Sequence, residues 1–112
     1  AIAIQNPSIV ERAGLIQFFE MAFELAWKLL KDYLEAEGYT IKSPRDAIKQ
    51  AFQSGIIIDG HHWMEALNDR NLTTHTYNET TALGVEQGIR LKYYPLLDQL
   101  RLTFNRYKTD LS

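Results

Sequence analysis

The chain of 112 residues is 46% hydrophobic and 23% charged, a composition typical of one globular domain with a packed core. It contains no cysteine, which excludes disulfides, thiolate metal sites and a cysteine nucleophile. Its net charge of −2 provides no global field to hold a nucleic-acid backbone, and no apolar run approaches the roughly 18 residues that a membrane-spanning helix needs.

The first predicted element is one long helix over residues 8–37, in which apolar side chains recur at steps of three and four residues. Pro7, which follows Asn6, is typical of a first helical turn, and Gly38 is typical of a helix end. A second apolar stripe leaves most of the circumference apolar, and its members are Leu15, Phe18, Ala22, Leu25, Trp27 and Leu29. We therefore expect this helix to be covered on two sides, by its own bundle and by another subunit.

A second, short helix is predicted to follow, with Ser43 as its cap, Pro44 at its first position and Gly55 just beyond its end. The isoleucines at 56–58 resemble a strand, but no second strand candidate exists to pair with them. We interpret them as a buried connector.

Asp59 is expected to cap a third helix that runs to about Arg70. A fourth helical region has its apolar residues within 83–104, and Pro95 must either kink it or start a fifth helix, because proline lacks a donor and clashes with the preceding turn. Helices joined by short loops imply an all-α fold. We expect an antiparallel four- to five-helix up-and-down bundle, formed by residues 1–112 as a single domain.

The segment 69–77 gathers an arginine, an amide, an imidazole and a phenol, which are Arg70, Asn71, His75 and Tyr77. Arginine can bind a phosphate through two parallel donors, and histidine can both accept and donate a proton near neutral pH. This combination could perform phosphodiester chemistry. The same residue types also occur in ordinary polar turns, where Arg70 would pair with Asp69 or Glu79 and His75 would bind a carbonyl.

On one unbroken helix Arg70 and His75 would lie about 140° apart, since each residue turns by about 100°. Thr76 followed three residues later by Glu79 matches a capping box, so we expect the third helix to end near Arg70 and the fourth to start at Thr76. His75 would then lie just outside a helix N-terminus, where free backbone N–H groups favour an anion such as phosphate.

Two further polar groupings are weaker candidates. His61 and His62 suggest a metal, but adjacent residues point in different directions on a helix and no third ligand has suitable spacing. We therefore expect neither a metal nor a cofactor. Glu24 and Lys28 stand one helical turn apart, which predicts an ion pair on a solvated face.

Four segments together resemble one family, and they are residues 14–20 (GLIQFFE), 23–28 (FELAWK), 43–45 (SPR) and 69–77. In this order, and over most of the chain, they are similar to the HEPN family of small helical proteins encoded beside minimal nucleotidyltransferases. The resemblance implies a helical bundle that forms a two-fold homodimer. It also implies that the Arg-x4-His-x-Tyr motif of each subunit faces its mate across a cleft.

For activity, the resemblance implies a toxin that cleaves RNA, either tRNA or mRNA, without a metal. In such ribonucleases the motif arginine and histidine carry catalysis, which transfers to Arg70 and His75, with Asn71 at the polar position after the arginine. As a hypothesis, His75 assists proton transfer at the ribose 2′-hydroxyl or the leaving oxygen, while Arg70 stabilises charge on the phosphoryl oxygens. The partner, a cognate minimal nucleotidyltransferase antitoxin, would silence the toxin by adding AMP to Tyr77.

Relatives usually carry a helix ahead of the segment that begins near Ser8, and the first residue here is Ala1 rather than Met. We therefore expect the N-terminal helix of the family to be missing from this sequence. No export signal opens the chain, so a cytoplasmic protein is expected. Two other roles stay open: a non-catalytic subunit that presents a nucleotide or other substrate to the transferase, and a dimeric helical adaptor.

Overall fold

The computed structural model describes residues 2–76 and 78–111, with the side chains of residues 9–76 and 78–106. Its elements in chain order are α1 (Ile2–Ala36), α2 (Pro44–Gln53), α3 (Gly60–Asn71), the 3-10 helix η1 (Leu72–His75), α4 (Glu79–Gly88), the π-helical turn η2 (Ile89–Tyr93) and α5 (Tyr94–Leu111). The described residues contain helices and turns but no strand, which confirms the all-α prediction.

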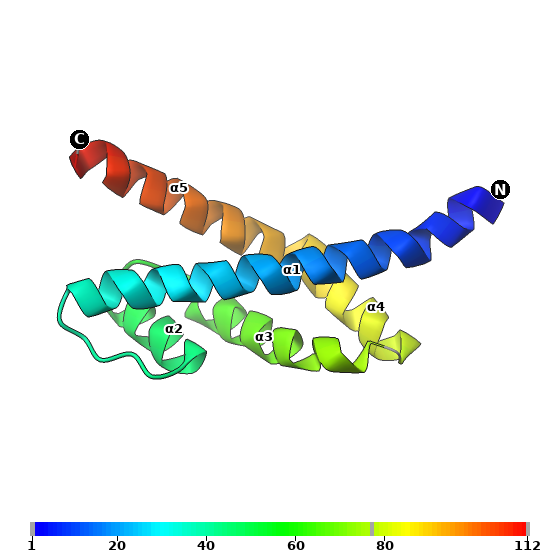
Figure 1. Cartoon of the computed structure of the whole chain (residues 1–112), viewed down its shortest axis with the longest axis horizontal. Coiled ribbons are helices and arrows are strands. Elements are labelled where there is room, and N and C mark those ends of the chain that lie inside the picture. The colour runs from blue at the N-terminus through cyan, green and yellow to red at the C-terminus, as the bar shows by residue number, and fades with distance from the viewer. Residues whose placement is uncertain (1, 77, 112) are drawn as a thin grey trace.

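α1 is the longest element of a molecule that measures 52 × 28 × 18 Å (Figure 1). α2 and α3 pack along α1, and α3 runs in the direction opposite to it. α4, η2 and α5 form one continuous arm that returns across α1, as expected for an antiparallel bundle (Figure 1). Among the described residues, no helix combines the length and the apolar character needed to cross a membrane.

α1 begins earlier than its sequence suggested. The helix starts at Ile2, so the predicted start near Ser8 is wrong, and Pro7 lies inside the helix. Proline removes one N–H donor, and a single loss near a helix end does not prevent the preceding turn from being helical. The predicted end is confirmed, because α1 stops at Ala36 and Gly38 adopts a φ of +100°, the left-handed conformation common after a helix.

The second and third helices begin as predicted. Ser43 and Asp59 are their caps, and in each case the side-chain oxygen accepts a hydrogen bond at 3.1 Å from the backbone N–H three residues later. Between these helices, Ile56 and Ile57 are buried whereas Ile58 is exposed. The interpretation as a buried connector therefore holds for two of the three isoleucines.

The fourth helix does not begin where the capping-box pattern placed it. The Thr76 hydroxyl donates to the Thr73 carbonyl at 3.1 Å, so it does not cap α4. Asn78 caps α4 instead, because its Oδ1 accepts the backbone N–H three residues later at 3.2 Å, and α4 begins at Glu79. Asparagine is a stronger cap than threonine. The predicted start at Thr76 is wrong, and His75 therefore does not flank the helix N-terminus at which we expected an anion.

Pro95 starts a helix rather than kinking one. It is the second residue of α5, directly after η2. The Tyr94 N–H still donates to the Ile89 carbonyl, so the backbone is helical on both sides of the junction and the π-helical turn accommodates the donor that proline lacks. The fifth helix, one of the two predicted outcomes for this proline, is observed as α5, which is joined to α4 through η2.

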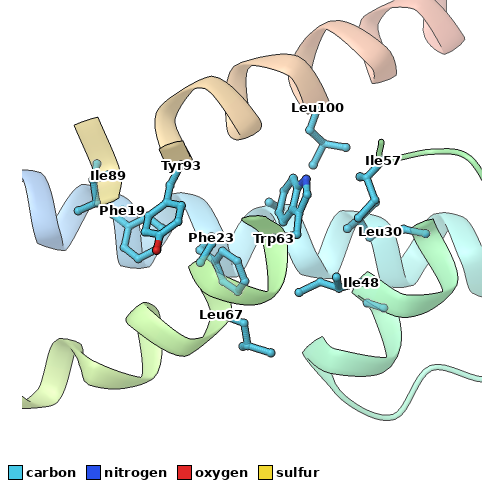
Figure 2. Close-up of a cluster of buried hydrophobic side chains, with 14 of the residues drawn as sticks. Phe19, Phe23, Leu30, Ile48, Ile57, Trp63, Leu67, Ile89, Tyr93 and Leu100 are labelled. Carbon is cyan, nitrogen blue, oxygen red and sulfur yellow. The ribbon is translucent and has the colours of Figure 1, made fainter. Parts of the chain in front are cut away.

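The hydrophobic core joins α1 to α3 and to the arm (Figure 2). The buried ring of Phe19 stacks on that of Tyr93, with 5.3 Å between ring centroids. The buried ring of Phe23 contacts Trp63 at 6.1 Å. Such aromatic pairs stabilise a fold by more than the burial of their surface area alone would give. They fix α3 and η2 against the middle of α1, so the segment that follows α3 starts from a rigid position.

Candidate functional site

Arg70 lies in the last turn of α3, where its side chain is 28% exposed. Its Nη2 pairs with the Oε1 of Glu24 on α1, and its Nη1 donates to the Asn71 Oδ1 at 3.2 Å. The alternative pairing with Asp69 or Glu79 is not observed, because the packing of α3 on α1 presents the Glu24 carboxylate to the guanidinium. Arg70 is therefore held from both α1 and α3.

The Glu24 carboxylate is fixed within its own helix. Its Oε2 accepts a hydrogen bond from the Trp27 Nε1 at 3.0 Å and lies 3.7 Å from the Lys28 Nζ. The predicted Glu24–Lys28 ion pair is thus confirmed. Residues three and four positions apart share one helical face, so these contacts form without any change in α1. The carboxylate is a prearranged acceptor for Arg70.

η1 carries the second half of the motif. The Thr73 hydroxyl donates to the Arg70 carbonyl at 2.7 Å, and Thr73 is buried, so η1 is tied to the end of α3. His75 is the last residue of η1 and is exposed. The structure brings Arg70 and Asn71 into contact and places His75 on the exposed turn that follows them. Tyr77 lies outside the described residues.

Asp69 precedes Arg70 but faces the arm. Its Oδ2 accepts a hydrogen bond from the Tyr93 hydroxyl at 2.5 Å. Burial, together with this carboxylate, raises the pKa of Tyr93 far above its ordinary value, so the phenol stays protonated and remains a donor. A Cβ added to Gly88 would lie 2.6 Å from the Tyr93 ring, so the position of this ring against the end of α4 requires glycine there. Asp69 is therefore an anchor between the end of α3 and η2.

Three cations near the arm are paired with carboxylates. Arg12 and Arg90 both contact Glu86, at 2.9 and 3.1 Å, and Lys92 lies 3.2 Å from Glu65. The hydrogen bond from Arg12 holds the pKa of Glu86 below its ordinary value, and Arg90 adds to this effect. These pairs connect α4 to α1 and η2 to α3.

His61 and His62 also face carboxylates. The His62 Nδ1 pairs with Asp59, and the His61 Nε2 lies 3.4 Å from the Glu65 Oε1. Within the part of the chain whose side chains are described, no three His, Cys, Asp or Glu residues are grouped to hold a metal ion. Each of the two imidazoles therefore has a carboxylate partner on its own helix or at the cap of that helix.

Known proteins are similar to this chain in sequence and in fold. The sequence model of a family described as "Nucleotidyltransferase substrate binding protein like" matches residues 2–106. The chain belongs to this family. It is 33% identical over 107 residues to a Haemophilus influenzae protein named "Probable ribonuclease HepT", covering 86% of this chain and 73% of the relative. It also resembles the crystal structure of a Thermus thermophilus protein, with 37% identity and a TM-score of 0.75, over 81% of this chain and 78% of that one.

These similarities confirm the resemblance to HepT-type proteins that the segments 14–20, 23–28, 43–45 and 69–77 indicated. The structural match confirms the helical bundle. Sequence reasoning missed two partners of the motif region, Glu24 for Arg70 and Tyr93 for Asp69. Both contacts join residues on different helices, and local spacing gives no signal for them. The one available hint was that Glu24 lies within the resembling segment 23–28.

Proposed function

We propose that the chain is the toxin of a HEPN and minimal nucleotidyltransferase toxin–antitoxin pair, and that it cleaves RNA without a metal through Arg70, His75 and Asn71. The similarity to "Probable ribonuclease HepT" carries this proposal. The geometry supports it, because an arginine held by two partners lies in the last turn of α3 and an exposed histidine ends the turn that follows. One group can bind a phosphate and the other can transfer a proton.

The proposed reaction uses the ribose 2′-hydroxyl as its nucleophile. His75 removes the hydroxyl proton as the 2′-oxygen bonds to phosphorus, the bond from phosphorus to the 5′-oxygen breaks, and a second imidazole returns a proton to that leaving oxygen. Arg70 donates to the non-bridging oxygens, where negative charge grows in the transition state. The products are a 2′,3′-cyclic phosphate and a 5′-hydroxyl.

The second imidazole would come from a second copy of the chain. α1 carries a stripe of exposed apolar side chains, which are Val10, Phe18, Met21, Leu25 and Leu29. At about 100° per residue these positions fall within one side of the helix, and Glu24 borders that side. A two-fold homodimer through this stripe would bury it and bring the two Arg70–Glu24 pairs to the rim of one shared cleft.

The proposal is tested by incubating purified protein with total cellular RNA in the presence of EDTA. Arg70→Ala and His75→Ala forms, with folding checked by circular dichroism, are compared with wild type. His61→Ala is the matched control, because it removes an exposed imidazole from α3 outside the motif. We expect wild type and His61→Ala to degrade RNA and the two motif variants to leave it intact. Intact RNA with wild type would refute the ribonuclease.

We propose that a cognate MntA-like nucleotidyltransferase silences the toxin by adding AMP to Tyr77. An anionic nucleotide two residues from His75 would repel an incoming RNA phosphate. Co-expression with the adjacent transferase should add AMP mass to wild type and to Tyr94→Phe, an exposed tyrosine on α5, but not to Tyr77→Phe. Unmodified wild type, or AMP on Tyr77→Phe, would contradict this form of control.

The family description favours a second candidate, a non-catalytic subunit that binds the substrate of a nucleotidyltransferase. In this role Arg70 would bind the phosphates of a nucleotide and His75 would transfer no proton. Isothermal titration calorimetry with ATP separates the two roles. Intact RNA in every sample, together with nucleotide binding that Arg70→Ala weakens and His75→Ala leaves unchanged, would support the binding subunit.

A further inference from the structure

We infer that Glu24 is a positioning residue for the reaction, which acts by fixing the direction of the Arg70 guanidinium. This inference rests on the proposed ribonuclease. The two residues belong to different helices, and their ion pair is the contact through which α1 reaches the motif arginine. Both side chains are about one-third exposed, at 28% for Arg70 and 33% for Glu24, so the pair lies at the surface of the bundle where a phosphate has access.

Glu24 is suited to this role because contacts within α1 fix its carboxylate independently of Arg70. The Trp27 Nε1 donates to one carboxylate oxygen at 3.0 Å, and the Lys28 Nζ lies 3.7 Å from the same oxygen. This leaves the other oxygen, Oε1, for Arg70. Trp27 packs against the hydrophobic core, so the donor that orients Glu24 belongs to the rigid part of the bundle.

The remaining contacts restrain Arg70 at other points. The Asn71 Oδ1 accepts from its Nη1 at 3.2 Å, and the Thr73 hydroxyl donates to its carbonyl at 2.7 Å. A guanidinium has about five N–H donors, so two contacts leave about three for an anion. Arginine otherwise loses much rotamer freedom when it binds a ligand, and a fixed guanidinium avoids that loss during the reaction.

The ion pair also weakens the binding of RNA, and this effect distinguishes a residue that positions Arg70 from one that simply attracts the substrate. The Glu24 carboxylate offsets the charge of Arg70 and repels a phosphate in the ground state. A charge-neutral glutamine at this position would therefore bind RNA at least as tightly, yet leave the guanidinium poorly directed in the transition state. A group that acts only in the transition state lowers kcat without raising KM when it is removed.

The test measures cleavage of a short fluorophore–quencher oligoribonucleotide by full-length variants. We expect Glu24→Gln to lower kcat by roughly 10- to 100-fold, the range seen when a supporting contact of a reactive group is lost, with KM unchanged or lower. Trp27→Phe, which removes the N–H donor together with part of the ring that packs on the core, should give a smaller fall. Glu20→Gln, one turn earlier on α1, is the matched control and should retain wild-type kinetics.

If Glu24 acts through Arg70, the effects of substituting the two residues on the cleavage rate should not be additive. In an Arg70→Ala background, whose small residual rate is followed with the fluorescent substrate over long incubations at high protein concentration, Glu24→Gln should cause no further loss of rate, because the residue that it directs is absent. An equal loss in both backgrounds, a wild-type kcat, or a raised KM with unchanged kcat would overturn the inference. If wild type is active and Glu24→Gln is normal, this inference alone fails. An inactive wild type would refute the ribonuclease and the inference with it.

A second readout does not depend on turnover. The Nε–H resonance of Arg70 in ¹⁵N NMR spectra should report an ordered side chain in wild type and in Glu20→Gln, and increased mobility in Glu24→Gln and Trp27→Phe. Equal mobility of Arg70 in all four proteins would overturn the inference, because Glu24 would then not restrain the guanidinium.

Discussion

Replacing Gly88 with alanine should destabilise the protein, although the same change at an ordinary helical glycine stabilises it. A Cβ at this position would lie 2.6 Å from the Cε2 of Tyr93, 3.0 Å from its Cζ and 3.0 Å from the Oδ2 of Asp69. The ring cannot move aside freely. It is buried, stacks on Phe19 and is held at its hydroxyl by Asp69. The new methyl group must therefore displace a restrained ring or the backbone of α4.

The magnitude follows from two opposing terms. Overpacking of a closely packed core costs about 1–3 kcal/mol, and the restrained Tyr93 ring places this site near the upper end, at about 3 kcal/mol. Alanine gains about 1 kcal/mol over glycine in helix propensity. The expected net loss for Gly88→Ala is therefore about 2 kcal/mol. For a domain of this size, such a loss lowers Tm by roughly 8 °C.

Gly84 supplies the matched control, since it lies one turn earlier on α4 and a Cβ there would meet no atom within 4 Å. Only the propensity term applies, so Gly84→Ala should gain about 0.5–1 kcal/mol. Urea denaturation followed by circular dichroism, at one protein concentration for all variants, measures both free energies of unfolding. Gly88→Ala as stable as Gly84→Ala would refute the reasoning, because it would show that the Tyr93 ring shifts at little cost.

Three further predictions concern pH and assembly. Tyr93→Phe should lose about 1–2 kcal/mol of unfolding free energy at neutral pH, because it leaves a carboxylate without its donor. Since burial raises the pKa of Tyr93, its stabilising contribution is complete below about pH 10 and is lost at higher pH. The free energy of unfolding, measured by urea denaturation, should therefore fall more steeply with rising pH for wild type than for Tyr93→Phe. Since Arg12 lowers the pKa of Glu86, the stabilisation by the Glu86 carboxylate is present at pH values above the ordinary pKa of 4.5 and is lost as pH falls. An unfolding free energy that decreases equally with falling pH in wild type and in Glu86→Gln would contradict this prediction. Leu25→Glu should convert the proposed dimer to monomer in sedimentation velocity, whereas Leu102→Glu on α5 should not; a dimeric Leu25→Glu protein would exclude the α1 stripe as the interface.

The parts of the fold that sequence predicted are those set by contacts within a few residues. Ser43 and Asp59 cap helices through an N–H three residues away, and Gly38 ends α1 through its own backbone conformation. These effects depend on local chemistry alone. They place α2, α3 and the end of α1 close to their predicted positions.

The start of α4 shows where local chemistry was ambiguous. Thr76 and Asn78 are both capping residues, and the sequence alone does not say which one the chain uses. The outcome depends on η1, which forms because the Thr73 hydroxyl binds the Arg70 carbonyl and the Thr76 hydroxyl binds the Thr73 carbonyl. Two competing side chain to backbone bonds thus moved the N-cap by two residues, from Thr76 to Asn78.

For the candidate site, sequence identified the arginine but not what surrounds it. The ion pair with Glu24 exists because α3 packs on α1 through aromatic contacts such as that between Phe23 and Trp63. The spacing of residues within α3 contains no information about that packing. A sequence motif can therefore single out candidate residues such as Arg70, while their partners follow only from the arrangement of helices.

The environment of Arg70 bears on the choice between the two proposed roles. A subunit that only binds the phosphates of a nucleotide gains most from an unopposed positive charge, because attraction in the ground state is its whole function. Here a carboxylate offsets that charge, and the indole of Trp27 keeps the carboxylate in place. Such an arrangement weakens ground-state attraction and fixes the direction of the donors. Since catalysis depends on the difference between transition-state and ground-state binding, the Glu24–Arg70 pair favours the ribonuclease over the binding subunit.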